Sequence, residues 1–427
     1  MVPLHENLKI SNYLNLILQL ILRVYSSTDR ISGFGPEGLG SIPSRLIIRM
    51  RKETKDYLIA SSILIGSCIG AGVLGIPYIA SKSGFFTTLF YIFFIGLIIL
   101  LSNLYLGEVA LRTKENHQLS GYAEKYLGKK GKKIMDFAFI FGIYASIVAY
   151  LIGMGDSLSY LIFGNLLHAI PLGILAGFVM IFLLWKGVGA LKKFEKLGVF
   201  IILFLLILIL ILFIPQVDFS NLGYNNFENF LLPFGVVLFA LLSFSAIPQV
   251  AYVLRNRKKV LKKSIITGSV ISIVFYVLFA FVVVGFMGIN TPEVATLALG
   301  SIFIFLGIFT IFTSHLSVGN ALEENFEFDD GVSKKSSWFL ASIIPMIIYI
   351  LISFFPFFSF TKVLSIGGVV SGGIIAILIM FIVKRAKEKG ERKPEYSIPL
   401  NLGIIVFLFL IFIFGILKEI FSFSILF

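Results

Sequence analysis

The sequence predicts an all-α polytopic membrane protein with about 11 transmembrane helices. Of its 427 residues, 58% are hydrophobic and only 14% are charged, whereas soluble proteins carry about 25% charged residues. Apolar runs of about 20 residues, enough for a helix to cross the hydrocarbon core, recur along the chain. The basic residues stand between these runs. Together these observations predict a chain that crosses the lipid bilayer of the cell membrane many times.

Eleven apolar runs are separated by charged or turn-forming residues, and each predicts one crossing. The expected spans are 57–80, 84–111, 133–163, 168–185, 195–215, 229–254, 264–288, 298–322, 336–355, 361–383 and 399–417.

The loops between these spans alternate in basic charge. Lys and Arg are frequent before the first span and after the second, fourth, sixth and tenth, whereas the loops 164–167, 216–228 and 289–297 contain none. Since cytoplasmic loops are enriched in Lys and Arg, we expect a cytoplasmic N-terminus and an extracellular C-terminus. The net charge of +13 follows from this pattern, so no nucleic-acid partner is expected.

Residues 1–49 differ from the rest of the chain. They contain one apolar stretch that is too short for a span, followed by a polar run. We expect a poorly ordered N-terminal extension, with a mis-assigned translation start as the alternative, and a membrane domain over 50–427.

Two of the expected spans contain helix breakers. The first carries GSCIGAGVLGIPY (66–78), and the sixth carries LLSFSAIPQ (241–249). Gly and Pro are poor helix formers, and lipid does not tolerate unpaired main-chain groups. The two breaks lie five spans apart, so their helices run in opposite directions, as in an inverted repeat of five helices plus five. The repeats would cover about 57–215 and 229–383, with an extra helix at about 399–417. The alternative is that these residues only allow close packing or a kink.

Several motifs resemble the hydroxy and aromatic amino acid permease family of the amino acid/polyamine/organocation superfamily. They are GSCIGAGVLGIPYIASKSGF, NLYLGEVALR, YASIVAYLIGMGDSL, LFALLSFSAIPQV and FTSHLSVGNAL. The resemblance implies a LeuT-type fold with helices 1 and 6 broken, and proton-coupled uptake of an amino acid. It makes 50–427 an amino acid transporter domain.

The resemblance also implies a substrate site at the two breaks. The backbone at Gly70, Ala71 and Gly72 would bind the substrate carboxylate, because a glycine lets a ligand approach the main chain. The substrate's amino group and side chain would face the second break. Its residues are Ser243, Phe244, Ser245 and Ala246. Tyr150 in the third span could direct its hydroxyl toward the carboxylate, and aromatic packing is the alternative.

The eighth span carries candidates for ion coupling. Thr310, Thr313 and Ser314 share one helix face, and sodium-coupled relatives place such hydroxyls opposite carbonyls of the first break, here near Cys68 and Ala71. The alternative is that the hydroxyls bond to their own helix. His315 titrates near neutral pH and lies at membrane depth, so it could carry a coupling proton; a neutral histidine bonded between helices is the alternative.

Glu108, near the end of the second span, matches the family's acidic position. It is a candidate for an inner gate, for a partner of freed backbone groups, or for a plain interfacial carboxylate.

We therefore expect a secondary active transporter, a permease that imports an L-amino acid by alternating access as a symporter of H+ or Na+. The scattered histidines and the absence of HExxH or nucleotide-binding motifs argue against an enzyme. The single cysteine, Cys68, excludes intramolecular disulfides and Cys-rich metal sites, and no cofactor is expected. A sensor, a uniporter or an exchanger on the same fold remain alternatives.

Overall fold

A computed structural model describes residues 44–186, 204, 207–355 and 357–424. The chain divides into two compact units, Met1–Thr54 and Lys55–Phe427, and the second contains the membrane-spanning helices. Regular secondary structure in the described part is helical, and no strand is present there. The all-α class is confirmed.

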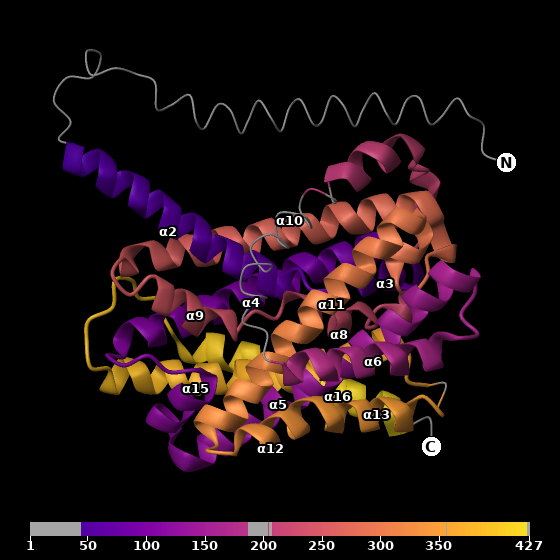
Figure 1. Cartoon of the computed structure of the whole chain (residues 1–427). Helices are drawn as coiled ribbons and strands as arrows, with labels where there is room; N and C mark the ends of the chain where they lie inside the picture. Colours follow the sequence, from indigo (N-terminus) through magenta and orange to yellow (C-terminus); the bar gives the residue numbers. More distant parts are fainter. Residues whose placement is uncertain (1–43, 187–203, 205–206, 356, 425–427) are drawn as a thin grey trace. The chain divides into compact units, whose positions relative to one another are not determined.

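Helices follow one another along the chain, some interrupted by short 3-10 or π segments (Figure 1). The α-helices are α2 (Ser44–Cys68), α3 (Ile76–Ser83), α4 (Phe85–Arg112), α5 (Leu119–Phe163), α6 (Ala169–Trp185), α8 (Pro233–Leu241), α9 (Ala246–Val253), α10 (Leu261–Met287), α11 (Ser301–Glu324), α12 (Lys334–Trp338), α13 (Ile344–Ile352), α14 (Phe360–Gly367), α15 (Gly373–Lys389) and α16 (Leu402–Ser424). The 3-10 segments are η2 (Ala71–Gly75), η3 (Ile214–Gln216), η4 (Phe219–Leu222), η5 (Phe227–Asn229), η6 (Lys258–Val260), η7 (Gly288–Asn290) and η8 (Ala295–Leu299). The π segments are η9 (Asn325–Asp329), η10 (Phe339–Ile343) and η11 (Gly368–Gly372).

The described residues contain eight helices long and apolar enough to cross a membrane, or nine if the bent pair Asp56–Cys68 and Ala71–Ser83 is one span. A polytopic protein is thus confirmed. The fourth expected span is the shorter helix Ala169–Trp185, and only Ile207–Gln216 of the fifth is a described apolar helix. Much of the fifth span lies outside the described residues, so the count of eleven stays a prediction. The same holds for the extension at 1–49, of which only the start of α2 is described.

The long helix α5 differs from its expected span, because it begins at Leu119 rather than at residue 133. Gly128 interrupts it with a positive φ of 77°, a left-handed conformation that glycine adopts readily. The first segment of α5 therefore changes direction before the membrane-spanning part begins.

Close helix contacts at small residues hold the bundle together, as is usual in membranes. Helix α5 packs against α6, α11, α14 and α15, whereas α4 packs against α10, α15 and α8. At Gly155 the main chain of α5 lies so near α6 that an added Cβ would be 3.1 Å from the nitrogen of Gly173.

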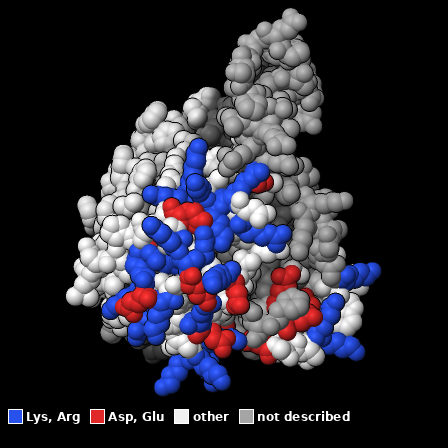
Figure 2. Space-filling model, turned by 90° about the vertical axis from the view of Figure 1, so that its left-hand side faces the viewer, with Lys and Arg blue, Asp and Glu red and all other residues white. Residues whose placement is uncertain are grey.

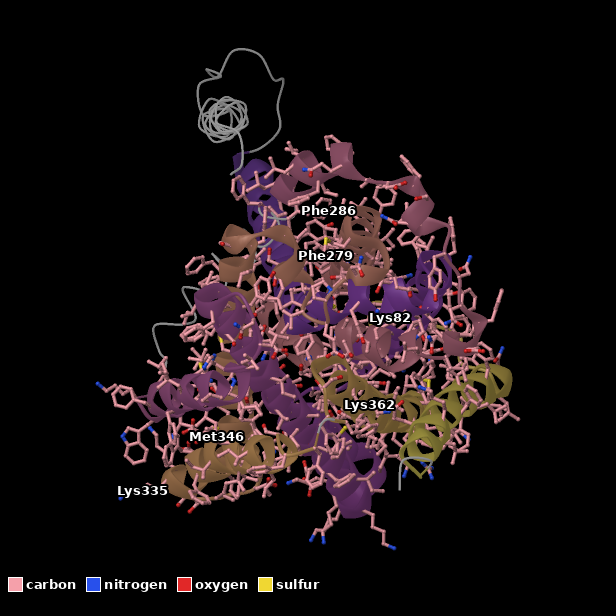
Figure 3. All side chains as sticks on the ribbon, turned by 90° about the vertical axis from the view of Figure 1, so that its right-hand side faces the viewer. Lys82, Phe279, Phe286, Lys335, Met346 and Lys362 are labelled. Atoms are coloured by element: carbon pink, nitrogen blue, oxygen red, sulfur yellow. The ribbon has the colours of Figure 1, made fainter. Side chains whose placement is uncertain are left out.

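Basic side chains gather at one face of the membrane-spanning unit. Helix α4 ends at Arg112 and α10 begins after Lys258 and Lys259 on one face, where Lys and Arg gather with Asp and Glu among them (Figure 2). We call this the basic face. Lys82, in the last turn of α3, and Lys362, in the first turn of α14, are labelled in Figure 3. Lys82 donates a hydrogen bond to the carbonyl of Ile289, after α10 ends.

Replacement of Gly155 by Ala tests the contact between α5 and α6. The new Cβ meets main-chain atoms of α6, which cannot rotate away, so we expect a loss of about 1–3 kcal/mol of stability. Gly403→Ala is the matched control, because the Cβ added there meets only Asn401 Oδ1 at 3.5 Å. Thermal unfolding in detergent checks both variants, and equal melting temperatures would contradict the contact.

Candidate functional site

The first break separates α2 from η2 and α3. Helix α2 ends at Cys68, and Gly70 is extended, with φ −99° and ψ −159°. The segments on either side are bent by 47°. The main-chain N–H of Gly70 donates to the carbonyl of Cys68 at 2.9 Å. The glycines and Pro77 thus end one helix and begin another, as the sequence predicts.

The second break separates α8 from α9. Helix α8 ends at Leu241, and Leu242 is extended, with φ −62° and ψ 122°. Helix α9 resumes at Ala246, whose N–H donates to the carbonyl of Ser243 at 3.1 Å. Both breaks expected from the sequence are therefore present, whereas the inverted repeat that relates them stays a prediction.

Gly70 faces α5 and α11 across the first break. A Cβ built on Gly70 would lie 3.2 Å from Ser314 Oγ and 3.8 Å from the hydroxyl of Tyr150. Gly70 is half-buried, so it remains partly accessible. The structure therefore brings together three predicted site residues, one from the first break and one each from α5 and α11.

Ala71 and Gly72 are buried, in contrast to Gly70. A Cβ on Gly72 would lie 3.0 Å from both Ala240 Cα and a ring carbon of Phe239. Gly72 therefore allows α8 to pack against η2. Of the three predicted carboxylate-binding positions, only Gly70 has accessible space beside its main chain.

The four predicted residues of the second break have different surroundings. Ser243 is buried and accepts a hydrogen bond from Asn103 Nδ2 at 2.9 Å. Phe244 and Ala246 are also buried, whereas Ser245 is exposed. Among the four, only Ser245 is open to a ligand.

The carbonyl ends of α2 and α8 meet one tyrosine of α10. The hydroxyl of Tyr276 contacts the carbonyl oxygens of both Cys68 and Ala240, the latter at 2.7 Å. Cys68 Sγ lies 3.9 Å from the carbonyl oxygen of Leu241. Tyr276 and Asn103 are completely buried. Two unbroken helices, α10 and α4, thus supply polar partners to both breaks.

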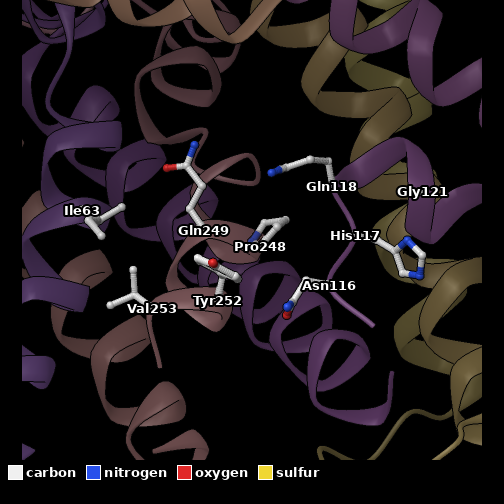
Figure 4. A pocket seen from close by; sticks show the side chains of 9 residues that line it. All are labelled: Ile63, Asn116, His117, Gln118, Gly121, Pro248, Gln249, Tyr252 and Val253. Carbon is white, nitrogen blue, oxygen red and sulfur yellow. The ribbon is translucent and has the colours of Figure 1, made fainter. Parts of the chain in front are cut away.

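A cavity of about 390 Å³ opens beside the two breaks, on the side where α9 ends. The cavity is lined by Ile63 of α2, by the segment before α5, and by α9 (Figure 4). Its polar lining includes Asn116, Gln118 and Gln249, all three exposed. Along the chain, Ser67 lies one helical turn after the cavity-lining Ile63, toward the first break, and Ser245, which belongs to the second break, lies one turn before Gln249. Both serines are exposed.

The other side of the breaks is closely packed. A Cβ on Gly75 would lie 3.1 Å from Thr361 and 3.3 Å from Val236. Phe360 is completely buried, and its ring lies 2.9 Å from the Cβ position of Gly153. Among the described residues, the cavity beside the breaks lies on the side of the basic face.

The candidates on α11 face different directions. Thr313 donates its hydroxyl to carbonyls of its own helix, Phe309 and Thr310, at 3.1 Å each. Thr310 lines a small cavity of about 20 Å³ with Thr296 and η2. Of the three hydroxyls, the one on Ser314 is the one near Gly70.

His315 is buried on a different side of α11. Ile311, one turn before it, contacts the Cβ position of Gly153 in α5, and Gly319, one turn after it, contacts Leu184 of α6. Residues one turn apart share a face, so His315 faces α5 and α6 rather than the first break. Its imidazole has no hydrogen-bond partner among the described residues.

Glu108 belongs to a polar cluster at the basic face, away from both breaks. It is completely buried, and its carboxylate accepts hydrogen bonds from Lys387 at 2.6 Å and from Arg112 at 2.9 Å. Ser397 Oγ and the N–H of Ile398 also donate to it, both at 2.8 Å. Such a fully partnered carboxylate can remain charged although it is buried. The described partners of Glu108 thus come from α4, α15 and the segment after α15, rather than from a broken helix.

That segment, residues 390–401, lies along the end of α4, and we call it the strap. Tyr396 donates to the carbonyl of Leu104 at 2.7 Å, and Tyr105 donates to that of Pro399 at 2.8 Å. Glu391 binds Lys125 of α5 at 2.7 Å and the N–H of Lys114 at 2.8 Å. The hydrogen bonds from Lys125 and Lys114 lower the pKa of Glu391.

Sequence reasoning missed Asn103, Tyr276 and the strap. Asn103 had a signal, since an amide inside an apolar span needs a polar partner. Tyr276 had none, because tyrosine is common throughout this chain, which contains 16 of them. The strap reads as an ordinary basic loop in sequence, and its contacts with α4 depend on the fold.

Comparison with known proteins agrees with this picture. A family model described as the tryptophan/tyrosine permease family matches residues 53–419. The chain is 28% identical over 227 residues to Tyrosine-specific transport system 1 of Haemophilus influenzae, covering 52% of this chain and 56% of that protein. It is 28% identical over 241 residues to Glutamine transporter 2 of Aliivibrio fischeri, covering 53% and 60%. It is 26% identical over 253 residues to the Low affinity tryptophan permease of Proteus vulgaris, covering 56% and 59%. The chain thus spans a little more than half the length of these relatives.

Acidification tests the attachment of the strap. Because the folded pKa of Glu391 is lowered, its stabilising effect is complete above the ordinary carboxyl range and is lost as the pH falls through the lowered pKa. We expect the N–H groups of Glu391 and Arg392, which donate to the carbonyl of Arg112, to exchange hydrogen faster in Glu391→Gln than in wild type at neutral pH. At acidic pH the difference should vanish.

Glu388→Gln is the matched control for this measurement, because Glu388 is exposed and, among the described residues, forms its ion pair with Arg385 on its own helix. Equal exchange of the strap in wild type and Glu391→Gln at neutral pH would show that the carboxylate does not hold it.

Proposed function

We propose that this chain, which belongs to the tryptophan/tyrosine permease family, imports an amino acid across the cell membrane by alternating access. The expected resemblance to aromatic amino acid permeases is confirmed by the family model, and so is the expectation of a transporter rather than an enzyme. The observation that carries the mechanism is the pair of broken helices, which are open toward one face and closed toward the other.

The two breaks supply complementary groups for a zwitterion. The second halves of the broken helices begin near Gly70 and Ser245, and helix N-termini favour a carboxylate. The first halves end at Cys68 and Leu241, and helix C-terminal carbonyls favour an ammonium group. Polar side chains on the way to the cavity are uncharged, which supports an amino acid with an uncharged side chain. The relatives' names give tyrosine, glutamine and tryptophan as the amino acids to test first.

We further propose that the basic face is cytoplasmic, which puts the N-terminus inside and the C-terminus outside. The supporting observation is the concentration of Lys and Arg at this face (Figure 2). The accessible cavity then opens toward the cytoplasm, and the closely packed side around Gly75 faces outward.

Exchange of amino acids in proteoliposomes tests the transport activity. Vesicles loaded with unlabelled tyrosine, tryptophan or glutamine should accumulate the labelled form of the substrate faster than empty vesicles do. Binding without such exchange would identify a sensor and contradict the proposal.

Gly70→Val is the variant that tests the site. The backbone at Gly70 suits any residue, but the new Cβ would lie 3.2 Å from Ser314 Oγ, so the added methyl groups crowd Ser314 and Tyr150. We expect exchange to fall by about tenfold to a hundredfold, as overpacking of about 1–3 kcal/mol implies. Gly403→Val, on the exposed side of α16, is the control and should exchange normally. If Gly70→Val exchanges as fast as wild type, the substrate site does not lie at Gly70.

We propose a cation, H+ or Na+, as the coupling ion, and Ser314 as the residue most concerned with it. Ser314 faces the first break, whereas His315 faces α5 and α6. Uptake driven separately by a sodium gradient and by a pH gradient identifies the ion. Ser314→Ala is expected to abolish the response to that gradient, and His315→Ala is expected to retain it. Uptake that responds to neither gradient would indicate a uniporter or an exchanger instead.

A further inference from the structure

Both broken helices contact α10 at Tyr276. What we infer from this contact rests on the proposed transport function. The hydroxyl of Tyr276 contacts carbonyl oxygens at the ends of both first halves, Cys68 in α2 and Ala240 in α8. Tyr276 is completely buried and belongs to an unbroken helix.

The two carbonyls differ in their dependence on this hydroxyl. The carbonyl of Cys68 also accepts the N–H of Gly70. No main-chain N–H among the described residues donates to the carbonyl of Ala240, because the extended backbone at Leu242 ends the helix. A tyrosine hydroxyl has one proton to donate. The two carbonyls therefore share this proton in a three-centre hydrogen bond, and among the described residues the Ala240 carbonyl has Tyr276 as its donor.

Other polar contacts near Tyr276 involve the ends of the same two helices, α2 and α8. Asn103 of α4 donates to Ser243 in the second break, and Cys68 Sγ lies near the carbonyl of Leu241. Gly70 follows Cys68 by two residues, so the position of the Cys68 carbonyl fixes where the accessible main chain of Gly70 begins. The bonds at Tyr276 thus connect the two breaks to each other and to α10.

We propose that Tyr276 is a positioning residue for the substrate site. Its hydroxyl holds the carbonyl ends of α2 and α8 in one arrangement while the site is empty, so that Gly70 and Ser245 are already in place when an amino acid binds. Preorganisation of this kind improves affinity because the ordering of the chain does not have to occur during binding.

Tyr276→Phe tests the proposal, since it removes the hydroxyl and keeps the ring. The dissociation constant for the transported amino acid should rise about tenfold, the factor given by one hydrogen bond of ordinary net strength. Exchange at saturating substrate should stay near that of wild type. Tyr349→Phe is the matched control, because the Tyr349 hydroxyl donates to the carbonyl of Ile170 at 3.4 Å, between α13 and α6. It likewise removes a tyrosine hydroxyl that faces a main-chain carbonyl, in a longer contact, and should leave the affinity unchanged.

Cys68 provides a second measurement that needs no transport. It is the single cysteine of the chain and is buried. Release of the α2 end in Tyr276→Phe should raise the rate at which a small thiol reagent modifies Cys68 about tenfold, by the same bond energy, with no rise in Tyr349→Phe. If wild type exchanges no amino acid, the proposed function fails, and the modification rates still decide the role of Tyr276.

The proposal is overturned if Cys68 in Tyr276→Phe reacts no faster than in Tyr349→Phe. Should Tyr276→Phe not accumulate in the membrane, difluorotyrosine at position 276 replaces it. Its hydroxyl is a stronger donor on an almost unchanged ring, so it should slow the modification of Cys68, and an unchanged rate would equally overturn the proposal.

Discussion

The structure depends on one constraint, that main-chain polar groups at membrane depth must find partners inside the protein. An unbroken helix meets this requirement by itself, whereas α2 and α8 end within the bundle and leave carbonyl oxygens without helical partners. Tyr276 supplies the Ala240 carbonyl, and Asn103 fixes Ser243. A break in a membrane helix is therefore stable here only because neighbouring unbroken helices carry the matching donors.

The partners of the two breaks lie mainly on one side, and this leaves the other side open. Helices α4 and α10 supply Asn103 and Tyr276, whereas α5 and α11 present Tyr150 and Ser314 to Gly70, which is half-buried. A ligand entering from the cavity meets main chain and uncharged side chains rather than lipid. The asymmetry explains why Gly70 is accessible although Gly72, two residues later, is packed against Ala240.

The sequence predicts the breaks well because Gly and Pro act locally. GSCIGAGVLGIPY and LLSFSAIPQ contain residues that weaken a helix locally, so both breaks could be located before any tertiary contact was known. The surroundings of individual site residues could not be predicted in this way, because they depend on how each helix is rotated about its own axis. Thr313 and Ser314 are neighbours in sequence, yet one bonds to its own helix and the other faces Gly70. Similarly, Glu108 reads as a gate candidate, but its partner Lys387 is 279 residues away in the chain.

The buried carboxylate of Glu108 and the amide of Asn103 act on the same helix at different depths. Glu108 joins the end of α4 to α15 and to the strap, whereas Asn103, five residues earlier, joins α4 to the second break. Removing one partner from a buried ion pair costs about 3–5 kcal/mol. The bonds at Glu108 therefore resist displacement of α4 from α15 and the strap. Because Asn103 and Glu108 belong to the same helix, the bonds of Glu108 at the basic face also determine where the second break lies along α4. A movement that closes the cavity can carry α4 and the strap along with the second break, or it can separate Asn103 from Ser243. Because the bonds at Glu108 hold α4 and the strap together, we expect α4 and the strap to move as one unit with the second break.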